Sequence, residues 1–228
     1  MPPIIRNFLG VLVSYVFVFG FIWFATLLLK RGWLQPTTTR KVIHIGVAHW
    51  WLIAMAMLDD PWVASIGPAS FIIINAIAMR KQLLPAMDQG ADRRNAGTVY
   101  FPMALLVLVN VCWRGLVPIW VGGVAVLVLG WGDGLAALIG ERLSSPSFRS
   151  FGGRKSLAGT AAMFVASFIV TLIFTLMFNQ ARQGIGPGLG VAAVIAATAT
   201  AVEVLTPLGI DNLTVPAAVF ALYAGVFL

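Results

Sequence analysis

Charged residues, cysteine and histidine are all scarce in this chain. Only 10% of its 228 residues are charged, whereas a soluble domain normally has about 25%. The single cysteine, Cys112, excludes an intrachain disulfide framework and a cysteine-rich metal site. The sequence also has no His-Glu-x-x-His zinc motif, no Walker A loop and no Gly-x-Ser-x-Gly elbow. These absences exclude an ordinary soluble domain and the commonest zinc, P-loop and serine-hydrolase sites.

Apolar residues are abundant, at 60% of the chain, and they gather in long runs. Most runs are long enough to cross a hydrocarbon core about 30 Å thick, and in lipid such a run satisfies its own backbone as a helix. We therefore predict an all-α, polytopic transmembrane helical bundle that forms one domain over residues 1–228. The fourth and last runs are short, so the count is seven or eight spans. The expected spans are about 7–29, 42–58, 62–79, 99–113, 116–138, 157–178, 188–205 and 213–228.

Basic residues divide unevenly between the connections. Twelve of the fifteen Lys and Arg residues follow the first, third and fifth spans, and Arg6, Arg114 and Arg182 lie on the other side. The positive-inside rule then places the basic connections in the cytoplasm and both termini outside. We expect a multi-pass protein of the cell membrane with its active site on the cytoplasmic face. The net charge of +7 then reflects topology and anionic lipid headgroups, and we expect no nucleic-acid partner.

The first two polar clusters lie near Arg40 and near Thr98. At helical spacing Arg40 and His44 lie about 40° apart, and Lys41 flanks them, which suits a grip on phosphate at the membrane surface. A preceding threonine can cap this helix. The alternative is that the basic pair only anchors the topology and that His44 is a packed polar residue. Thr98 follows Gly97 and offers a cap or a hydroxyl ligand, although this stretch alone fits a plain loop better.

The third cluster is the most informative. Asp133 lies within an apolar run, where an ionisable group is costly and indicates function, and its carboxylate suits Mg²⁺. Downstream, a glycine pair can aim backbone N–H groups inward, basic residues add charge and a serine can cap the next helix. Topological anchors in a glycine loop would explain the basic residues but not Asp133. The predicted phosphate cradle consists of Gly152, Gly153, Arg154, Lys155 and Ser156.

The fourth cluster joins Glu203, near the end of the seventh span, to Asp211 and Asn212 at the start of the eighth. Its carboxylate and amide oxygens suit a metal ion or a substrate hydroxyl. The alternative for Asp211 is that it caps a helix and does nothing more. We therefore predict an Mg²⁺ site drawn from Asp133, Glu203, Asp211 and Asn212.

Taken in order, the four clusters resemble the CTP-dependent lipid-alcohol kinases, which include dolichol, phytol and farnesol kinases and the yeast-type diacylglycerol kinase. The resemblance covers about residues 36–220, and its ending looks most like the phytol kinase branch. The chain is shorter than dolichol kinase, which argues against dolichol as substrate. The matching elements are Arg40-Lys41-x-x-His44, Gly97-Thr98-x-Tyr100-Phe101-Pro102, Gly132-Asp133-x-x-Ala136, Lys155-Ser156-x-x-Gly159-Thr160, and Glu203 with Asp211-Asn212-Leu213-Thr214-x-Pro216.

The resemblance implies transfer of the γ-phosphate of CTP to a membrane lipid alcohol, with Mg²⁺ present. It makes Asp133, helped by Glu203 or Asp211, the metal ligand. Phosphoryl transfer depends mainly on positioning and charge neutralisation. The resemblance assigns His44 or Asp211 to orient or deprotonate the alcohol. The residues implied to bind the nucleotide phosphates are Arg40, Lys41, Thr98, Gly152, Gly153, Arg154, Lys155, Ser156, Gly159 and Thr160.

Three alternatives stay open on the sequence. They are a CTP-dependent diacylglycerol kinase, a cytidylyltransferase resembling CDP-diacylglycerol synthase, and a small transporter or scaffold without chemistry. The cytidylyltransferase would release pyrophosphate, whereas a kinase releases CDP. A transporter would place polar groups at the membrane midplane, but here they gather at the predicted cytoplasmic ends. The lipid alcohol and the choice between CTP and ATP also stay open, as does a homodimer packed through Gly122 and Gly123.

Overall fold

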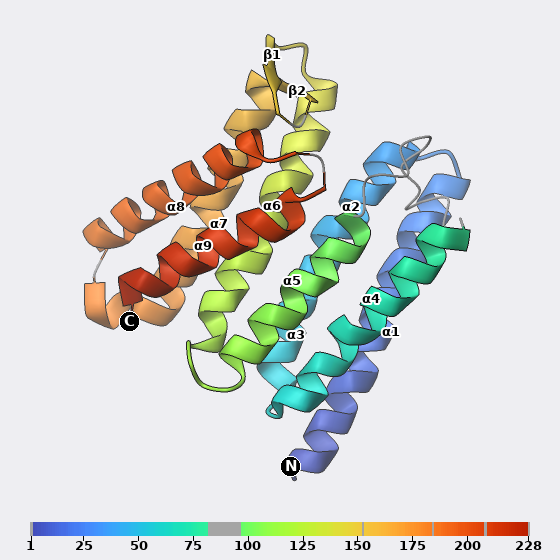
Figure 1. The fold of residues 1–228 in the computed structure, drawn as a ribbon, viewed down its shortest axis with the longest axis vertical. Helices are drawn as coiled ribbons and strands as arrows, with labels where there is room; N and C mark the ends of the chain where they lie inside the picture. The colour runs from blue at the N-terminus through green and yellow to red at the C-terminus, as the bar shows by residue number, and fades with distance from the viewer. Residues whose placement is uncertain (1, 82–96, 152, 184, 208, 228) are drawn as a thin grey trace. The chain divides into compact units, whose positions relative to one another are not determined.

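The structure is a computed structural model that describes residues 2–81, 97–151, 153–183, 185–207 and 209–227. Helices fill most of these ranges, so the predicted all-α polytopic fold is confirmed (Figure 1). Two short strands are the exception. The elements are α1 (Pro3–Lys30), α2 (Pro36–Ala48), α3 (Trp50–Met57), α4 (Pro61–Lys81), α5 (Gly97–Cys112), α6 (Ile119–Arg142), β1 (Ser147–Ser150), β2 (Gly153–Ser156), α7 (Leu157–Gln183), α8 (Ile185–Leu205) and α9 (Asp211–Phe227).

Membrane-spanning character is clearest in α1, α4, α6, α7 and α8. Within the described residues these five helices are long and apolar enough to cross a membrane. The helices α5 and α9 are also apolar but shorter, as expected for the fourth and last spans. A helix of fewer than about 17 apolar residues falls short of a typical hydrocarbon core. The chain is therefore a membrane protein whose spans differ in length.

The predicted span 42–58 is divided into α2 and α3 at His49. The backbone N–H of His49 donates to the carbonyl of Gly46 at 3.1 Å, and its ring Nδ1 bonds to the carbonyl of Ile45 at 2.9 Å. The predicted threonine cap is wrong, because the helix already begins after Gln35. Thr39 instead lies inside α2 and donates its hydroxyl to the Gln35 carbonyl at 2.9 Å.

The N-terminal unit comprises Met1–Ile119 and has aromatic contacts between its helices. Tyr15 of α1 stacks on Phe71 of α4 with ring centroids 6.0 Å apart, and Trp51 of α3 lies edge-on to Trp113 with centroids 5.2 Å apart. Large rings bury much apolar area while their polar atoms find partners. The Trp51 indole, for example, donates to the carbonyl of Ile119 at 3.0 Å.

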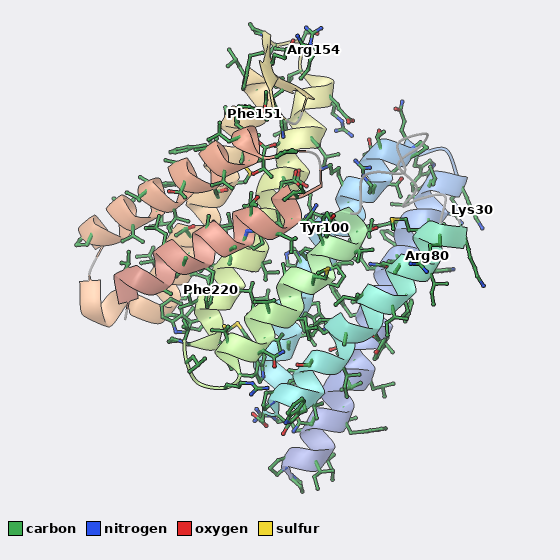
Figure 2. All side chains as sticks on the ribbon, viewed as in Figure 1. Lys30, Arg80, Tyr100, Phe151, Arg154 and Phe220 are labelled. Carbon is green, nitrogen blue, oxygen red and sulfur yellow. The ribbon has the colours of Figure 1, made fainter. Side chains whose placement is uncertain are left out.

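The helices of this unit run antiparallel, which gathers cations at one end. The helix α1 ends at Lys30 and α4 ends at Arg80 and Lys81, and α2 and α5 begin at the same end of the unit. Figure 2 shows Lys30, Arg80 and Tyr100 there. We call this the basic end of the N-terminal unit. It corresponds to the connections that the sequence analysis assigned to the cytoplasm.

The opposite end of the N-terminal unit carries paired charges. Asp60 caps α4, since its Oδ1 accepts the backbone N–H groups of Trp62 and Val63 at 2.8 and 3.0 Å. The neighbouring Asp59 pairs with Arg6, and both side chains are exposed. These contacts explain the acidic turn before α4 without any catalytic role.

The C-terminal unit comprises Trp120–Leu228, and within it α7 packs against α8 and α8 against α9. The backbones of α6 and α7 approach closely, because a Cβ added to Gly159 would lie 2.6 Å from the Ala136 carbonyl oxygen. Thr175 of α7 shares a hydrogen bond of 2.7 Å with the Tyr223 hydroxyl of α9. The end of α6, the strands, the start of α7, the end of α8 and the start of α9 share one end of this unit (Figure 1).

A two-stranded antiparallel hairpin connects α6 to α7, and the sequence analysis did not predict it. Its register pairs Ser147 with Ser156 and Arg149 with Arg154. Gly153 has a φ of +120°, a left-handed value that favours glycine. A glycine pair between two short polar-apolar segments is a hairpin signal, so the pattern was present in the sequence.

Candidate active site

Asp133 lies in the C-terminal half of α6, and its residue is 7% exposed. The preceding Gly132 packs directly against α7, since an added Cβ there would collide with Met163 and lie 3.0 Å from the Ser167 hydroxyl. The two helices are therefore in contact at the level of the carboxylate. An ionisable side chain buried among apolar helices is costly, which keeps Asp133 a strong functional candidate.

The start of α7 is capped by two serine side chains. Ser156 accepts the backbone N–H of Gly159 at 3.1 Å, as predicted, and Ser145 accepts that of Ala158 at 3.1 Å. Thr160 donates its hydroxyl to the carbonyl of Ser156 at 3.1 Å. A helix N-terminus carries partial positive charge and attracts anions such as phosphate. This end of α7 thus favours negative charge beside the hairpin.

Lys155 of β2 forms a salt bridge with Glu203 of α8. The side chain of Lys155 is 21% exposed and that of Glu203 is 5% exposed, so the pair is largely withdrawn from water. The hairpin is tied to α8 a second time, because Ser150 donates its hydroxyl to the carbonyl of Val204. The sequence analysis assigned Lys155 to phosphate and Glu203 to metal, and both residues lie at one place.

The turn between α8 and α9 holds Asp211 and Asn212. Gly209 has a φ of +82°, and Asp211 Oδ1 accepts the backbone N–H of Asn212 at 2.9 Å and its side-chain N–H at 3.1 Å. Asn212 Oδ1 is buried and accepts no hydrogen bond within the described part of the chain. The hydroxyls of Thr206 and Thr214 bridge the two helices at 3.0 Å. A buried amide oxygen of this kind is available for a cation or a hydroxyl donor.

The remaining cradle residues lie on the hairpin. Arg154 is exposed and donates to the Ser147 hydroxyl at 2.7 Å across the two strands, and Gly153 is exposed beside it (Figure 2). Gly152 lies outside the described residues. The predicted glycine-rich loop is therefore a short hairpin that presents a cation next to the capped start of α7.

The first two clusters meet in the N-terminal unit. His44 packs against Phe101 of α5 with ring centroids 4.8 Å apart and an interplanar angle of 59°. Thr98, in the first turn of α5, accepts the Asn75 side-chain N–H through its carbonyl at 2.7 Å. The first-cluster residues all lie on α2 and are half-buried; they are Arg40, Lys41 and His44.

Sequence reasoning missed two features of the C-terminal unit. The Lys155–Glu203 pair joins residues 48 positions apart, and the Ser145 cap acts 13 positions ahead. No local pattern predicts such contacts, because the hairpin creates them. The sequence did offer one signal for the ion pair: Lys155 and Glu203 carry opposite charges and were predicted to lie on the same side of the membrane.

The predicted Mg²⁺ site is not brought together as a set of three carboxylates, although its oxygen donors are of the chemical class that Mg²⁺ binds. No group of three or more His, Cys, Asp or Glu side chains is assembled within the described ranges. Mg²⁺ commonly takes one or two carboxylates and fills its remaining positions with phosphate oxygens and water. The buried Asp133 carboxylate, the Glu203 carboxylate and the open Asn212 oxygen belong to the hard-oxygen class that Mg²⁺ prefers.

Comparison with curated proteins gives three relatives. The chain is 34% identical over 191 residues to the phytol kinase of Synechocystis sp. (strain ATCC 27184 / PCC 6803 / Kazusa), an alignment covering 83% of this chain and 79% of that protein. It is 26% identical over 150 residues to the probable phytol kinase, chloroplastic, of Triticum aestivum, covering 61% of this chain and 49% of that protein. It is 27% identical over 139 residues to the probable phytol kinase 2, chloroplastic, of Glycine max, covering 61% of this chain and 46% of that protein. No protein-family model and no solved structure matches the chain.

Proposed function

This chain belongs to the phytol and polyprenol kinase family, and from that premise we propose that it transfers the γ-phosphate of CTP to a membrane isoprenoid alcohol of the phytol, geranylgeraniol or polyprenol type. The observation that carries the proposal is the convergence, at one end of the C-terminal unit, of the Lys155–Glu203 pair with the capped start of α7. Cations and a helix N-terminus beside carboxylates suit a triphosphate far better than they suit a passive membrane scaffold.

The nucleotide phosphates would bind at the hairpin. Lys155 is held by Glu203 and so has a fixed position from which its ammonium can contact phosphate oxygens. Arg154 adds a second cation on the same strand, and the start of α7 contributes its dipole near Ser156 and Gly159. Thr160 lies one turn into α7. Arg40 and Lys41 lie on α2 of the N-terminal unit, and their predicted role in phosphate binding stays a prediction.

The Mg²⁺ site would draw on one or two of the predicted carboxylates, Asp133, Glu203 and Asp211, and on the amide oxygen of Asn212, because the described residues do not bring all three carboxylates together. When bound, Mg²⁺ neutralises charge on the phosphate oxygens. Burial of Asp133 and of the Asn212 amide oxygen keeps these donors oriented without competing water. Glu203 would keep Lys155 and the cation close together, because its two carboxylate oxygens can serve both.

In the reaction, the alcohol oxygen attacks the γ-phosphorus and forms a new P–O bond. The bond between the γ-phosphorus and the β–γ bridging oxygen breaks, and CDP leaves with that electron pair. His44 or Asp211 would take the hydroxyl proton, and both side chains are partly exposed. The products are the lipid phosphate and CDP.

We also propose that this chemistry takes place on the cytoplasmic face of the cell membrane. The excess of basic residues in the connections after α1, α4 and α6 supports this orientation. With Cys112 replaced, single cysteines at Lys30 and Arg154 should react with an impermeant maleimide from the cytoplasmic side. Labelling of the two positions from opposite sides would contradict the proposal.

The decisive experiment is incubation of the purified protein with Mg²⁺, γ-labelled CTP or ATP and a panel of lipid alcohols. We expect label in the lipid product, CDP as the second product, and CTP to be the better donor. Pyrophosphate release with a cytidylyl-lipid product would indicate the cytidylyltransferase alternative instead. Preference for diacylglycerol would redirect the substrate assignment, and the absence of any turnover would overturn the kinase assignment.

A further inference from the structure

An apolar pocket lies within the N-terminal unit, between α1, α2, α3, α4 and α5. Its walls include Val47, Trp50, Gly67, Phe71 and Phe101. Ligand pockets for small molecules are lined mainly by apolar and aromatic side chains. The lining of this pocket therefore suits a hydrocarbon ligand.

The polar side chains along the pocket bond within the protein. Tyr15 and Ser70 share a hydrogen bond of 2.7 Å, and the Ser14 hydroxyl donates to the carbonyl of Gly10 at 2.7 Å. Asn75 donates to the carbonyl of Thr98 at 2.7 Å. A ligand with polar groups along its length would have to displace these bonds, whereas an aliphatic chain leaves them intact.

The pocket has a deep part and a part near the basic end. Asn75 lies six residues before Lys81 at the end of α4, about 9 Å along the helix, whereas Gly67 lies about 21 Å from the same end. Phe101, at the shallow part, packs against the ring of His44. The candidate base thus adjoins the shallow part, and the pocket extends away from it into the apolar depth.

We infer that this pocket binds the isoprenoid chain of the substrate, with the hydroxyl toward His44 and the far end of the chain toward Gly67. The inference rests on the proposed function and names the substrate's binding site in the N-terminal unit. A branched hydrocarbon chain can lie against these apolar walls without needing polar partners. The curated relatives are named as phytol kinases. Since the chain comes from lipid and not from water, selection for chain length would come from the fit of the chain against the pocket walls.

Gly67 allows a direct test. A Cβ at this position would lie 3.5 Å from the Trp50 ring, an ordinary contact, so the helix tolerates a side chain while its further atoms fill the deep part. In Gly67→Leu we expect kcat/KM for a 20-carbon alcohol to fall at least about tenfold relative to a 10-carbon alcohol, because the added side chain takes the space of the far end of the longer chain. Gly20→Leu on α1 is the matched control, because nothing lies within 4 Å of a Cβ there. Its chain-length ratio should equal that of the wild type.

An unchanged chain-length ratio in folded Gly67→Leu would overturn the inference while leaving the kinase assignment intact. A second measurement needs no variant and no turnover. Wild-type protein is irradiated with geranylgeraniol that carries a diazirine at the end of its chain, and the labelled peptides are identified. Labelling of α4 and α3 around Gly67 and Trp50, displaced by unlabelled geranylgeraniol, supports the pocket.

Labelling confined to the C-terminal unit would contradict it, as would labelling that phospholipid displaces and geranylgeraniol does not. If the wild-type protein phosphorylates no alcohol, the kinase proposal fails, and the cross-link still reports whether the pocket binds an isoprenoid chain. The two failures are therefore distinguishable.

Discussion

Both units have ring contacts between helices, and the C-terminal unit adds close helix backbones and an ion pair. In the N-terminal unit, rings fill the space between helices, as in the stacking of Tyr15 on Phe71. In the C-terminal unit, helix backbones touch at Gly159, and the buried Lys155–Glu203 pair ties a hairpin to a helix. Ring packing encloses apolar space, whereas close backbones and ion pairs hold charged groups at fixed positions.

We propose that this difference reflects a division of labour within one membrane enzyme. The N-terminal unit encloses an apolar pocket beside His44, which suits the lipid part of a substrate. The C-terminal unit gathers carboxylates, a cation and a capped helix start, which suit a charged nucleotide. Substitutions that affect one function and spare the other would test this division.

The largest effect should come from Asp133. Replacing it by asparagine keeps the shape of the side chain but removes the buried charge, so we expect kcat/KM to fall about 10²–10³-fold, as when one electrostatic contact to the reacting group is lost. Phosphoryl transfer in detergent, with size-exclusion chromatography to check folding, measures it. Asp59→Asn is the matched control, because Asp59 is exposed at the end of the N-terminal unit opposite its basic end. This substitution should change activity less than about twofold. Full activity of Asp133→Asn would remove the carboxylate from the mechanism.

His44 tests whether the N-terminal unit contributes to the chemistry as well as to lipid binding. Loss of a general base typically slows a reaction at least about 100-fold, so His44→Gln should lower kcat by about that factor. Binding of the photoreactive alcohol should persist, because the pocket walls are unchanged. The matched control is His49→Gln, since His49 bonds to its own helix at Ile45 and should retain activity. If His44→Gln is fully active and Asp211→Asn is not, the proton acceptor belongs to the C-terminal unit.

The sequence predicted the helical framework well because apolar run length determines spans directly. It placed Ser156 as a cap and Arg40 with His44 on one helix, since both depend on local spacing. The roles assigned to the four clusters remain predictions. Their order along the chain carried more information than any single motif.

The sequence did not predict contacts that depend on distant parts of the chain. The hairpin converts a supposed loop into paired strands, and it alone brings Lys155 to Glu203. The division of span 42–58 at His49 was also unforeseen, because the sequence analysis read these residues as one continuous apolar run. The pocket in the N-terminal unit could not be predicted, since its walls come from five helices.

Variants of the Lys155–Glu203 pair can distinguish a structural role of the pair from a functional one. Lys155→Met leaves the buried Glu203 charge without its partner, and we expect a loss of about 3 kcal/mol in unfolding free energy. Glu203→Gln should lower the unfolding free energy by less, because the residue that it leaves without a partner, Lys155, is the more exposed of the two. The double variant should regain most of the stability, measured by thermal unfolding in detergent, but should stay at least about tenfold less active. Recovery of activity together with stability would show that the pair only holds the hairpin.

The smallest expected effect concerns how tightly each unit is packed, and glycines in the two units offer the test. A methyl group on Gly159 would lie 2.6 Å from the carbonyl oxygen of Ala136, and a backbone cannot move aside without shifting the helix. Overpacking of this kind costs about 1–3 kcal/mol, so Gly159→Ala should lower the unfolding free energy by that amount. At Gly46 in the N-terminal unit the three atoms nearest to an added Cβ all belong to the ring of Phe21, a side chain that can move aside, so Gly46→Ala should cost less.

Gly190→Ala on α8 is the control for both, because nothing lies within 4 Å of the added Cβ. It should stabilise the protein by about 0.5–1 kcal/mol through helix propensity alone. Thermal unfolding of the three variants at one detergent concentration measures the differences. Equal losses for Gly159→Ala and Gly46→Ala would contradict the contrast, because the N-terminal unit would then be as rigid as the C-terminal unit. A larger loss at Gly159 would mean that backbone contact fixes α6 against α7, and with it the position of Asp133.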